Sequence, residues 1–159
     1  MDQLLDSKLD QETPQYSDYA SFGQRLVAAI IDGVIMYVVQ MIIFAVFGLS
    51  LIGKTNTYED GIPTSFWLAY LVLICAQVAY FVVLESSEKQ ATFGKQAMGI
   101  VVTDMNGNRI TPLNALGRYF AKIPSGLILG IGYFMQPFTQ KKQALHDMIA
   151  STLVYKSVK

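Results

Sequence analysis

The sequence predicts an α-helical membrane protein with two transmembrane helices, an amphipathic interfacial helix, a re-entrant or short third hydrophobic segment, and a small cytoplasmic β-hairpin or sheet. Composition is the first observation behind this prediction: 52% of the 159 residues are hydrophobic and 15% are charged, whereas an ordinary soluble domain carries about 25% charged residues. The second is a pair of long uncharged runs, each able to cross a bilayer. Twelve basic and twelve acidic side chains cancel, so the net charge indicates no nucleic acid partner.

The N-terminal residues differ in character from the rest of the chain. Residues 1–19 are acidic and polar and lack the basic start of a signal peptide. A disordered tail is therefore expected there. The membrane domain covers residues 20–156, a length that is normal for one domain.

The distribution of charge predicts two spans. Between Arg25 and Lys54 the only charged residue is Asp32. Because a helix needs about 20 apolar residues to cross a bilayer, a first transmembrane helix is predicted over about residues 26–52. Residues 64–84 form a second uncharged run with aromatic residues near its start, where Trp and Tyr favour the membrane interface.

A β-hairpin is predicted over residues 100–111. The pair Asn106-Gly107 favours a two-residue turn, because both positions of such a turn need a positive φ. β-Branched residues flank the pair on both sides. The C-terminal segment, residues 140–156, ends in a stretch that is typical of a strand and could join this hairpin.

Residues 112–123 have the pattern of an amphipathic helix. Thr111 is suited to cap it, Pro112 to begin it and Pro124 to end it. The apolar side comprises Leu113, Leu116, Phe120 and Ile123, and the polar side comprises Asn114, Arg118 and Lys122. A helix with a basic polar side can lie flat in the headgroup layer of a membrane, although packing on a soluble core would give the same pattern.

Residues 124–139 are the third hydrophobic segment. They are uncharged but interrupted by Pro and Gly, so they either cross the membrane a third time or return to their own side. Return leaves eleven of the twelve Lys and Arg residues on one side and only Lys54 on the other, which the positive-inside rule favours. Return also lets the C-terminal strand reach the hairpin. Both termini are therefore expected in the cytoplasm.

Asp32 is the first candidate for a functional site, because a charged side chain near the centre of a spanning helix costs roughly 2.5–3.5 kcal/mol on insertion scales. Arg25 lies two turns earlier, about 10 Å along the helix, which is too far for a direct ion pair. Small residues beside Asp32 would let another segment approach closely. Its partner is expected among the basic residues outside the span: Lys95, Arg118, Lys122 or the His146 region.

Gly94-Lys95 resembles a phosphate-binding loop only at first sight. That loop needs a glycine where Lys89 stands and Ser or Thr where Gln96 stands. Thr92 as the N-cap of a short helix is the simpler interpretation.

The pair His146-Asp147 does not indicate catalysis, because no nucleophile elbow or reactive cysteine accompanies it. Asp147 is expected instead to accept backbone hydrogen bonds or to pair with a basic side chain. One histidine and one cysteine, Cys75, leave nothing from which a metal or haem site could be built. The sequence thus predicts neither an enzyme nor a metal or cofactor site.

Three stretches together resemble the RDD family, small bacterial integral membrane proteins named for one arginine and two aspartates. RLVAAIIDGVIM resembles the family's first-helix pattern, TFGKQAMGIVVTDMNGNRIT its threonine-x-glycine-lysine stretch and strand, and ALHDMIASTLVY its histidine-aspartate ending. The resemblance implies that Arg25, Asp32 and Asp147 are the named residues. Asp104 is an alternative for the second aspartate.

The resemblance implies a multi-pass protein of the bacterial inner membrane and leaves two functions open. One is a small secondary transporter that exchanges protons for a monovalent cation at Asp32. Two helices cannot enclose a pathway, so this function would require a homo-oligomer in the lipid bilayer. The other is a non-catalytic adaptor or regulator of another membrane protein, in which Arg25, Asp32 and Asp147 form a structural network.

Overall fold

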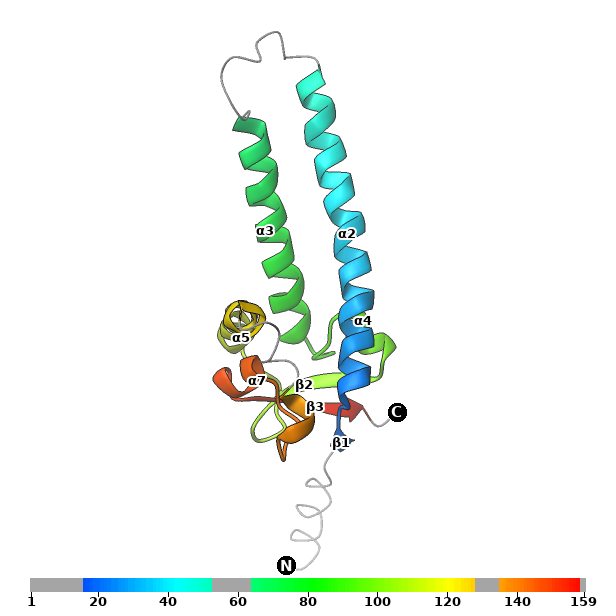
Figure 1. Ribbon diagram of the computed structural model, residues 1–159, viewed down its shortest axis with the longest axis vertical. Coiled ribbons are helices and arrows are strands. Elements are labelled where there is room, and N and C mark those ends of the chain that lie inside the picture. Colours follow the sequence, from blue (N-terminus) through cyan, green and yellow to red (C-terminus); the bar gives the residue numbers. More distant parts are fainter. Residues whose placement is uncertain (1–15, 53–63, 128–134, 158–159) are drawn as a thin grey trace, which may run out of the picture.

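Two long helices stand side by side on a layer made of a β-sheet and short helices (Figure 1). The computed structural model describes residues 16–52, 64–127 and 135–157. The first long helix leads away from the layer and the second leads back to it (Figure 1). The layer therefore meets the beginning of one long helix and the end of the other.

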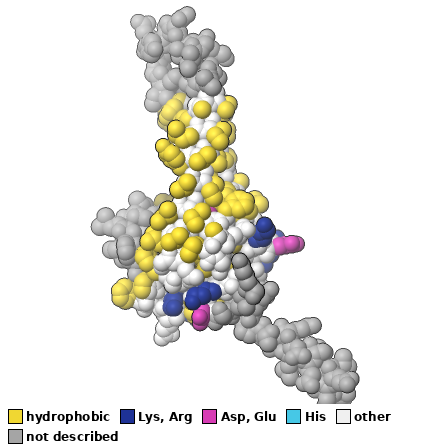
Figure 2. Space-filling model, turned by 90° about the vertical axis from the view of Figure 1, so that its right-hand side faces the viewer, with side chains coloured by type: hydrophobic (Ala, Val, Ile, Leu, Met, Phe, Trp, Pro, Cys, Tyr) yellow, Lys and Arg dark blue, Asp and Glu magenta, His cyan; other side chains and the backbone are white. Residues whose placement is uncertain are grey.

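The long helices, α2 (Phe22–Ile52) and α3 (Thr64–Glu85), correspond to the two predicted spans. Phe22–Phe47 and Phe66–Glu85 are long and apolar enough to cross a membrane. Their apolar side chains cover the outside of the helical part in Figure 2, whereas Lys and Arg side chains appear only in the layer below. Apolar surface of this extent needs a nonpolar surrounding or a partner.

Three strands form an antiparallel sheet in the order β1-β3-β2: β1 (Tyr16–Tyr19), β2 (Ile100–Asp104) and β3 (Thr152–Ser157). Val102 lies opposite Val154 in the register of β2 and β3. The predicted joining of the C-terminal strand to the hairpin region is therefore confirmed. The predicted tail over residues 1–19 is wrong at its end, because residues 16–19 pair with β3; residues 1–15 lie outside the described residues.

The predicted hairpin over residues 100–111 forms only in part. Gly107 has a φ of 83°, as the Asn-Gly signal requires, but Asn106 is not among the residues with positive φ. The N–H of Asp104 bonds the carbonyl of Asn108 at 2.9 Å, so three residues form the loop instead of two. Beyond the loop a single bridge joins Thr103 to Arg109. β3, and not the chain after the turn, pairs with β2 along its length.

The amphipathic helix α5 (Pro112–Leu127) is longer than the predicted 112–123. The hydroxyl of Thr111 accepts a hydrogen bond from the N–H of Asn114 at 3.2 Å, which confirms the predicted cap. Pro124 lies inside the helix and does not end it. Pro124 lies in the last turn, so the helix continues for only three residues beyond it. Proline removes the one hydrogen bond that its own N–H would donate to the carbonyl four residues earlier.

α5 is turned the opposite way from a helix on a soluble core. Its basic residue Arg118 is 2% exposed, whereas Leu113, Phe120 and Ile123 from the predicted apolar side are 76%, 52% and 54% exposed. A soluble helix would bury those apolar residues. An apolar side that faces outward beside two apolar helices is the arrangement expected where lipid is the surrounding medium.

The third hydrophobic segment, 124–139, is described only at its ends, because residues 128–134 lie outside the described residues. One end is the last turn of α5, and the other is the short 3-10 helix η1 (Gln136–Phe138). The chain then continues through α7 (Leu145–Ile149) into β3. These short elements complete the layer at the base of the long helices (Figure 1).

The core of the layer is small and joins the sheet to the first turns of α2. Ala28 of α2 packs with strand residues Ile100, Val102 and Val154 in one buried cluster. Ala20, Ile110 and Ala115 complete the cluster. This packing fixes the sheet directly below the region of α2 that carries Asp32.

Candidate functional site

Asp32 accepts three hydrogen bonds, all from neutral donors. The Tyr80 hydroxyl and the Gly94 N–H donate to Oδ1 at 2.7 and 2.8 Å, and the Thr92 hydroxyl donates to Oδ2 at 2.6 Å. Asp32 is only 3% exposed. A buried carboxylate is tolerated in an apolar helix when hydrogen bonds satisfy its oxygen atoms. Asp32 thus links α2 to α3 and to the short helix that follows α3.

That short helix, α4 (Phe93–Ala97), begins at Thr92, as predicted. The Thr92 hydroxyl accepts a hydrogen bond from the N–H of Lys95 at 3.4 Å while it donates to Asp32. Gly94 lies so close to α2 that a Cβ atom there would be 2.1 Å from the carbonyl oxygen of Ala28 and 2.8 Å from Cγ of Asp32. Small residues on both segments therefore allow the backbones to approach.

Arg118 of α5 lies between two buried carboxylates. Its Nη2 is 2.7 Å from Oδ1 of Asp147, and its Nη1 is 3.7 Å from Oε2 of Glu85. All three side chains are at most 3% exposed. Burying ions at this depth is favourable only when opposite charges meet with good geometry.

Two further cations complete the ion pairs. Lys95 of α4 pairs with Glu85, and Arg25 of α2 pairs with Asp147. Arg25 also donates to the carbonyl oxygen of Lys142 at 2.7 Å. The N–H of Ala144 donates to Oδ2 of Asp147 at 3.2 Å. Asp147 thereby joins α2, α5 and the start of α7.

These hydrogen bonds and ion pairs form one continuous series of contacts, which we call the polar network. It leads from Asp32 through α4, α3, α5 and α7 back to α2. Its charged members are Asp32, Lys95, Glu85, Arg118, Asp147 and Arg25. Arg25 and Asp32, which lie seven positions apart on α2, are thus connected through α3, α4, α5 and α7.

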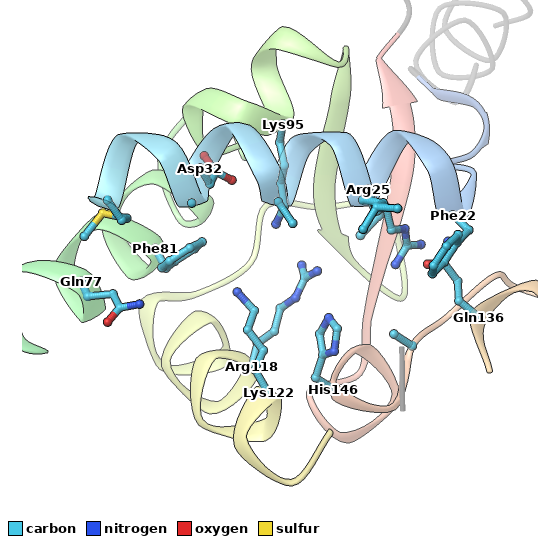
Figure 3. A pocket seen from close by; sticks show the side chains of 16 residues that line it. Phe22, Arg25, Asp32, Gln77, Phe81, Lys95, Arg118, Lys122, Gln136 and His146 are labelled. Carbon is cyan, nitrogen blue, oxygen red and sulfur yellow. The ribbon is translucent and has the colours of Figure 1, made fainter. Parts of the chain in front are cut away.

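The polar network borders a cavity of about 470 Å³. Figure 3 shows Arg25, Lys95, Arg118 and Lys122 pointing toward one another across this space. The Nζ of Lys122 lies 4.1 Å from the centre of the Phe81 ring, in a cation–π contact. The cavity therefore combines a group of cationic side chains with an aromatic wall.

Burial shapes the protonation of the groups in the layer. Burial lowers the pKa of Lys122 and of Lys95, while Glu85 opposes the shift. Burial would raise the pKa of Asp147, but the cations Arg118 and Arg25 hold it well below its usual range. Burial lowers the pKa of His146 to about 3, although Asp147 opposes the shift. His146 is accordingly neutral at pH 7.

The predicted partners of Asp32 are wrong. In the described ranges its hydrogen bonds come from Tyr80, Thr92 and Gly94, and it forms no ion pair with Lys95, Arg118, Lys122 or His146. Lys95 and Arg118 pair with Glu85 and Asp147 instead, and the ammonium group of Lys122 lies over the Phe81 ring. Arg25 was predicted to lie too far from Asp32 for direct pairing, and it pairs with Asp147 instead.

The two candidates for the second aspartate, Asp147 and Asp104, lie in different surroundings. Asp147 belongs to the polar network. Asp104 instead accepts hydrogen bonds from the N–H groups of Asn106 and Asn108 in the turn after β2, both at 2.8 Å. Asp147 was expected to accept backbone hydrogen bonds or to pair with a basic side chain, and it does both, with the N–H of Ala144 and with Arg25.

Sequence reasoning missed Glu85 and Tyr80. Glu85 is the first charge after a run of uncharged residues that starts at Thr64, and a charge at the end of a span could have been treated as a candidate partner for the bases. Tyr80 gave no such signal, because an aromatic residue inside a span is ordinary. Only the packing of α3 against α2 brings its hydroxyl to Asp32.

The network offers hydrogen-bonded and paired charges but little for metal chemistry. Across residues 16–52, 64–127 and 135–157 no group of three or more His, Cys, Asp or Glu side chains lies close enough together to hold a metal ion. What the arrangement does chemically is to neutralise buried charges and to join five helices.

The fold and the polar network define a class: a membrane protein in which buried Arg and Asp side chains tie two apolar helices to a layer of sheet and short helices. The chain belongs to the RDD family, whose family model matches residues 19–151. It is similar to the protein called "Uncharacterized protein YxaI" of Bacillus subtilis (strain 168), with 38% identity over 149 residues that cover 86% of this chain and 97% of the relative. No solved structure matches. The family resemblance inferred from the three sequence stretches is thus confirmed.

Gly94→Ala should disrupt the contact between α4 and α2. The added Cβ would meet the backbone oxygen of Ala28, which cannot move away as a side chain could, so we expect a loss of about 3 kcal/mol or more in the free energy of unfolding. The measurement is the melting temperature in detergent. Gly117→Ala is the control, because nothing lies within 4 Å of a Cβ there and alanine favours a helix. Equal melting of Gly94→Ala and wild type would contradict the close approach.

Asp147→Asn should destabilise the protein strongly. Arg25 and Arg118 would lose their shared counter-charge, and removing one partner of a buried ion pair costs about 3–5 kcal/mol. Denaturant titration of the purified protein measures the change. Asp18→Asn is the matched control: Asp18 is 70% exposed and pairs with Lys156 at 3.6 Å, so its effect should stay below about 1 kcal/mol. Similar effects of the two substitutions would argue against a structural role for Asp147.

Acid should weaken the fold through His146. Below pH 6.5 the unfolded chain protonates this histidine, whereas the folded chain keeps it neutral down to a pKa of about 3. The unfolded state then binds more protons, so stability falls as the pH decreases, by about 2 kcal/mol between pH 6.5 and 5. Unfolding curves at these two pH values test this. His146→Gln, which does not titrate, should remove that part of the pH dependence; an unchanged pH dependence would show that His146 is not the cause.

Proposed function

We propose that this protein is a multi-pass protein of the bacterial inner membrane with both termini in the cytoplasm. β1 and β3 are neighbours in one sheet, so both described ends of the chain meet at the same end of the long helices. Of the 12 Lys and Arg residues, only Lys54 lies in the connection between those helices. This distribution supports a cytoplasmic position for the layer under the positive-inside rule.

Residues 124–139 then return to the cytoplasmic side. Ser125 lies in α5, and the side chain of Gln136 donates a hydrogen bond to the carbonyl of Ala20 at 3.2 Å. Both ends of the segment therefore belong to the layer below the long helices. This geometry supports a return better than a third crossing, because a crossing would separate the two ends by about 30 Å of hydrocarbon.

The protein acts in this proposal as a non-catalytic membrane adaptor or regulator. The observation that carries it is the polar network, in which the charges are held by one another and Asp32 is held by three neutral donors. Such a network fixes the layer rigidly to its two-helix anchor. The apolar sides of α2 and α3, exposed along both helices (Figure 2), are where a second copy or another membrane protein would associate in the bilayer.

Cation/proton exchange at Asp32 is the competing function, and the geometry favours it less. A cation at Asp32 would have to replace hydrogen bonds from Tyr80, Thr92 and Gly94. It would also enter a cavity lined by four cationic side chains, which repel a positive ion. Two helices alone do not enclose a pathway, so exchange would in addition require an oligomer.

Asp32→Asn distinguishes the two functions. An adaptor should lose stability, because the amide replaces one accepting oxygen with a donor that faces other donors, at a cost of about 1–3 kcal/mol. We expect a lower melting temperature for Asp32→Asn. In liposomes that contain a pH-sensitive dye, neither wild type nor variant should move protons in response to a sodium or potassium gradient.

Liposomes without protein are the baseline for this measurement, and Asp18→Asn is the matched carboxylate control at an exposed position. Proton flux that depends on the cation gradient in wild type and disappears in Asp32→Asn, with an unchanged melting temperature, would replace the adaptor with a transporter.

A further inference from the structure

The cavity beside the polar network has an excess of positive charge. Arg25, Lys95, Arg118 and Lys122 line it, and Asp32 is the one acidic residue among its described lining residues. Both oxygen atoms of Asp32 already accept hydrogen bonds. Counted together with Glu85 and Asp147, the ion-pair partners of these cations, the four cations still outnumber the three carboxylates by one.

The acids that pair with these cations lie behind them. Glu85 and Asp147 do not line the cavity, although both contact cations that do. Glu85 and Asp147 therefore hold the cationic side chains in place from outside the described lining of the cavity. A preorganised set of cations of this kind is suited to bind an anion.

Lys122 is the side chain best placed to contact a ligand. Among the described residues its Nζ takes part in no hydrogen bond or ion pair, and it lies over two aromatic rings, 4.1 Å from the centre of the Phe81 ring and 5.9 Å from that of Tyr119. It can therefore turn toward an anion without breaking the ion pairs of the polar network. Figure 3 shows its ammonium group beside the guanidinium of Arg118, the neighbouring cation on α5.

The long helices supply an apolar wall of the cavity. Leu26, Ala29 and Met36 of α2 and Phe81 of α3 line it, and Gln77 adds one amide group. With about 470 Å³ the cavity is within the range of about 300–1,000 Å³ that small-molecule sites occupy. Its lining residues come from the ends of α2 and α3 nearest the layer and from the layer itself. Figure 1 shows this junction of the long helices with the layer, the level at which lipid phosphates would lie.

We infer that this cavity binds a phosphate-bearing anion through Lys122, Arg118, Arg25 and Lys95. Arginine and lysine are the side chains that bind phosphate most strongly, arginine through two parallel hydrogen bonds and lysine as a point charge. The anion comes either from the bilayer, as a phospholipid headgroup whose chains lie along the apolar wall, or from water, as free phosphate. The inference does not depend on the proposed adaptor function, because either an adaptor or a transporter could hold such an anion.

The test uses the purified full-length protein in an uncharged detergent. Dihexanoyl phosphatidylglycerol and sodium phosphate are titrated separately, with sodium chloride added to keep the ionic strength equal. The readouts are the melting temperature, which rises when a ligand binds the folded state, and calorimetric binding. Wild type should bind saturably. Lys122→Gln should bind at least about fivefold more weakly, the effect expected from one lysine beside a phosphate.

Lys89→Gln is the matched control, because Lys89 is exposed and does not line the cavity; it should bind like wild type. Binding of the lipid without competition by phosphate identifies the bilayer as the source, and competition by phosphate identifies a soluble anion. The inference is overturned if wild type binds neither probe saturably. It is also overturned if Lys122→Gln, folded with an unchanged melting temperature in the absence of ligand, binds as tightly as wild type.

Discussion

The guanidinium of Arg118 between the carboxylates of Glu85 and Asp147 is the contact on which the other elements depend. Each charge comes from a different helix, α5, α3 and α7. None of them could be buried alone beside two apolar helices, because an unpaired buried ion costs several kcal/mol. The three helices must therefore converge for any of them to be stable there. Lys95 and Arg25 extend the same constraint to α4 and α2.

The orientation of α5 follows from this constraint. Arg118 has to face inward to meet its carboxylates, and the apolar residues on the other side of the helix, such as Leu113 and Phe120, then face outward. In water this would be unfavourable, since both the burial of charge and the exposure of apolar surface oppose it. At a lipid surface the exposed apolar side is stabilised by the medium, and only the polar side needs protein partners.

Asp32 is satisfied by a different means. The bases of the layer are already held by Glu85 and Asp147, so the carboxylate takes its hydrogen bonds from a phenol, a hydroxyl and a backbone N–H. The absence of a side chain at Gly94 makes this possible, because α4 can approach α2 closely enough for its N–H to reach Asp32. Three donors thus hold the carboxylate in place, while Lys95, Arg118 and Arg25 pair with Glu85 and Asp147.

The sequence by itself determined the two apolar helices, the caps at Thr92 and Thr111, the joining of the C-terminal strand and the family, because charge distribution, capping residues and hydrophobic period are local properties of the chain. It also marked Arg25 and Asp32 as residues that needed partners. Only the tertiary structure decided which partners they have, that Glu85 belongs to the network, and which side of α5 faces the protein. Those outcomes depend on which charged side chains pair with one another across helices far apart in the sequence. A local pattern contains no information about which of the possible ion pairs form.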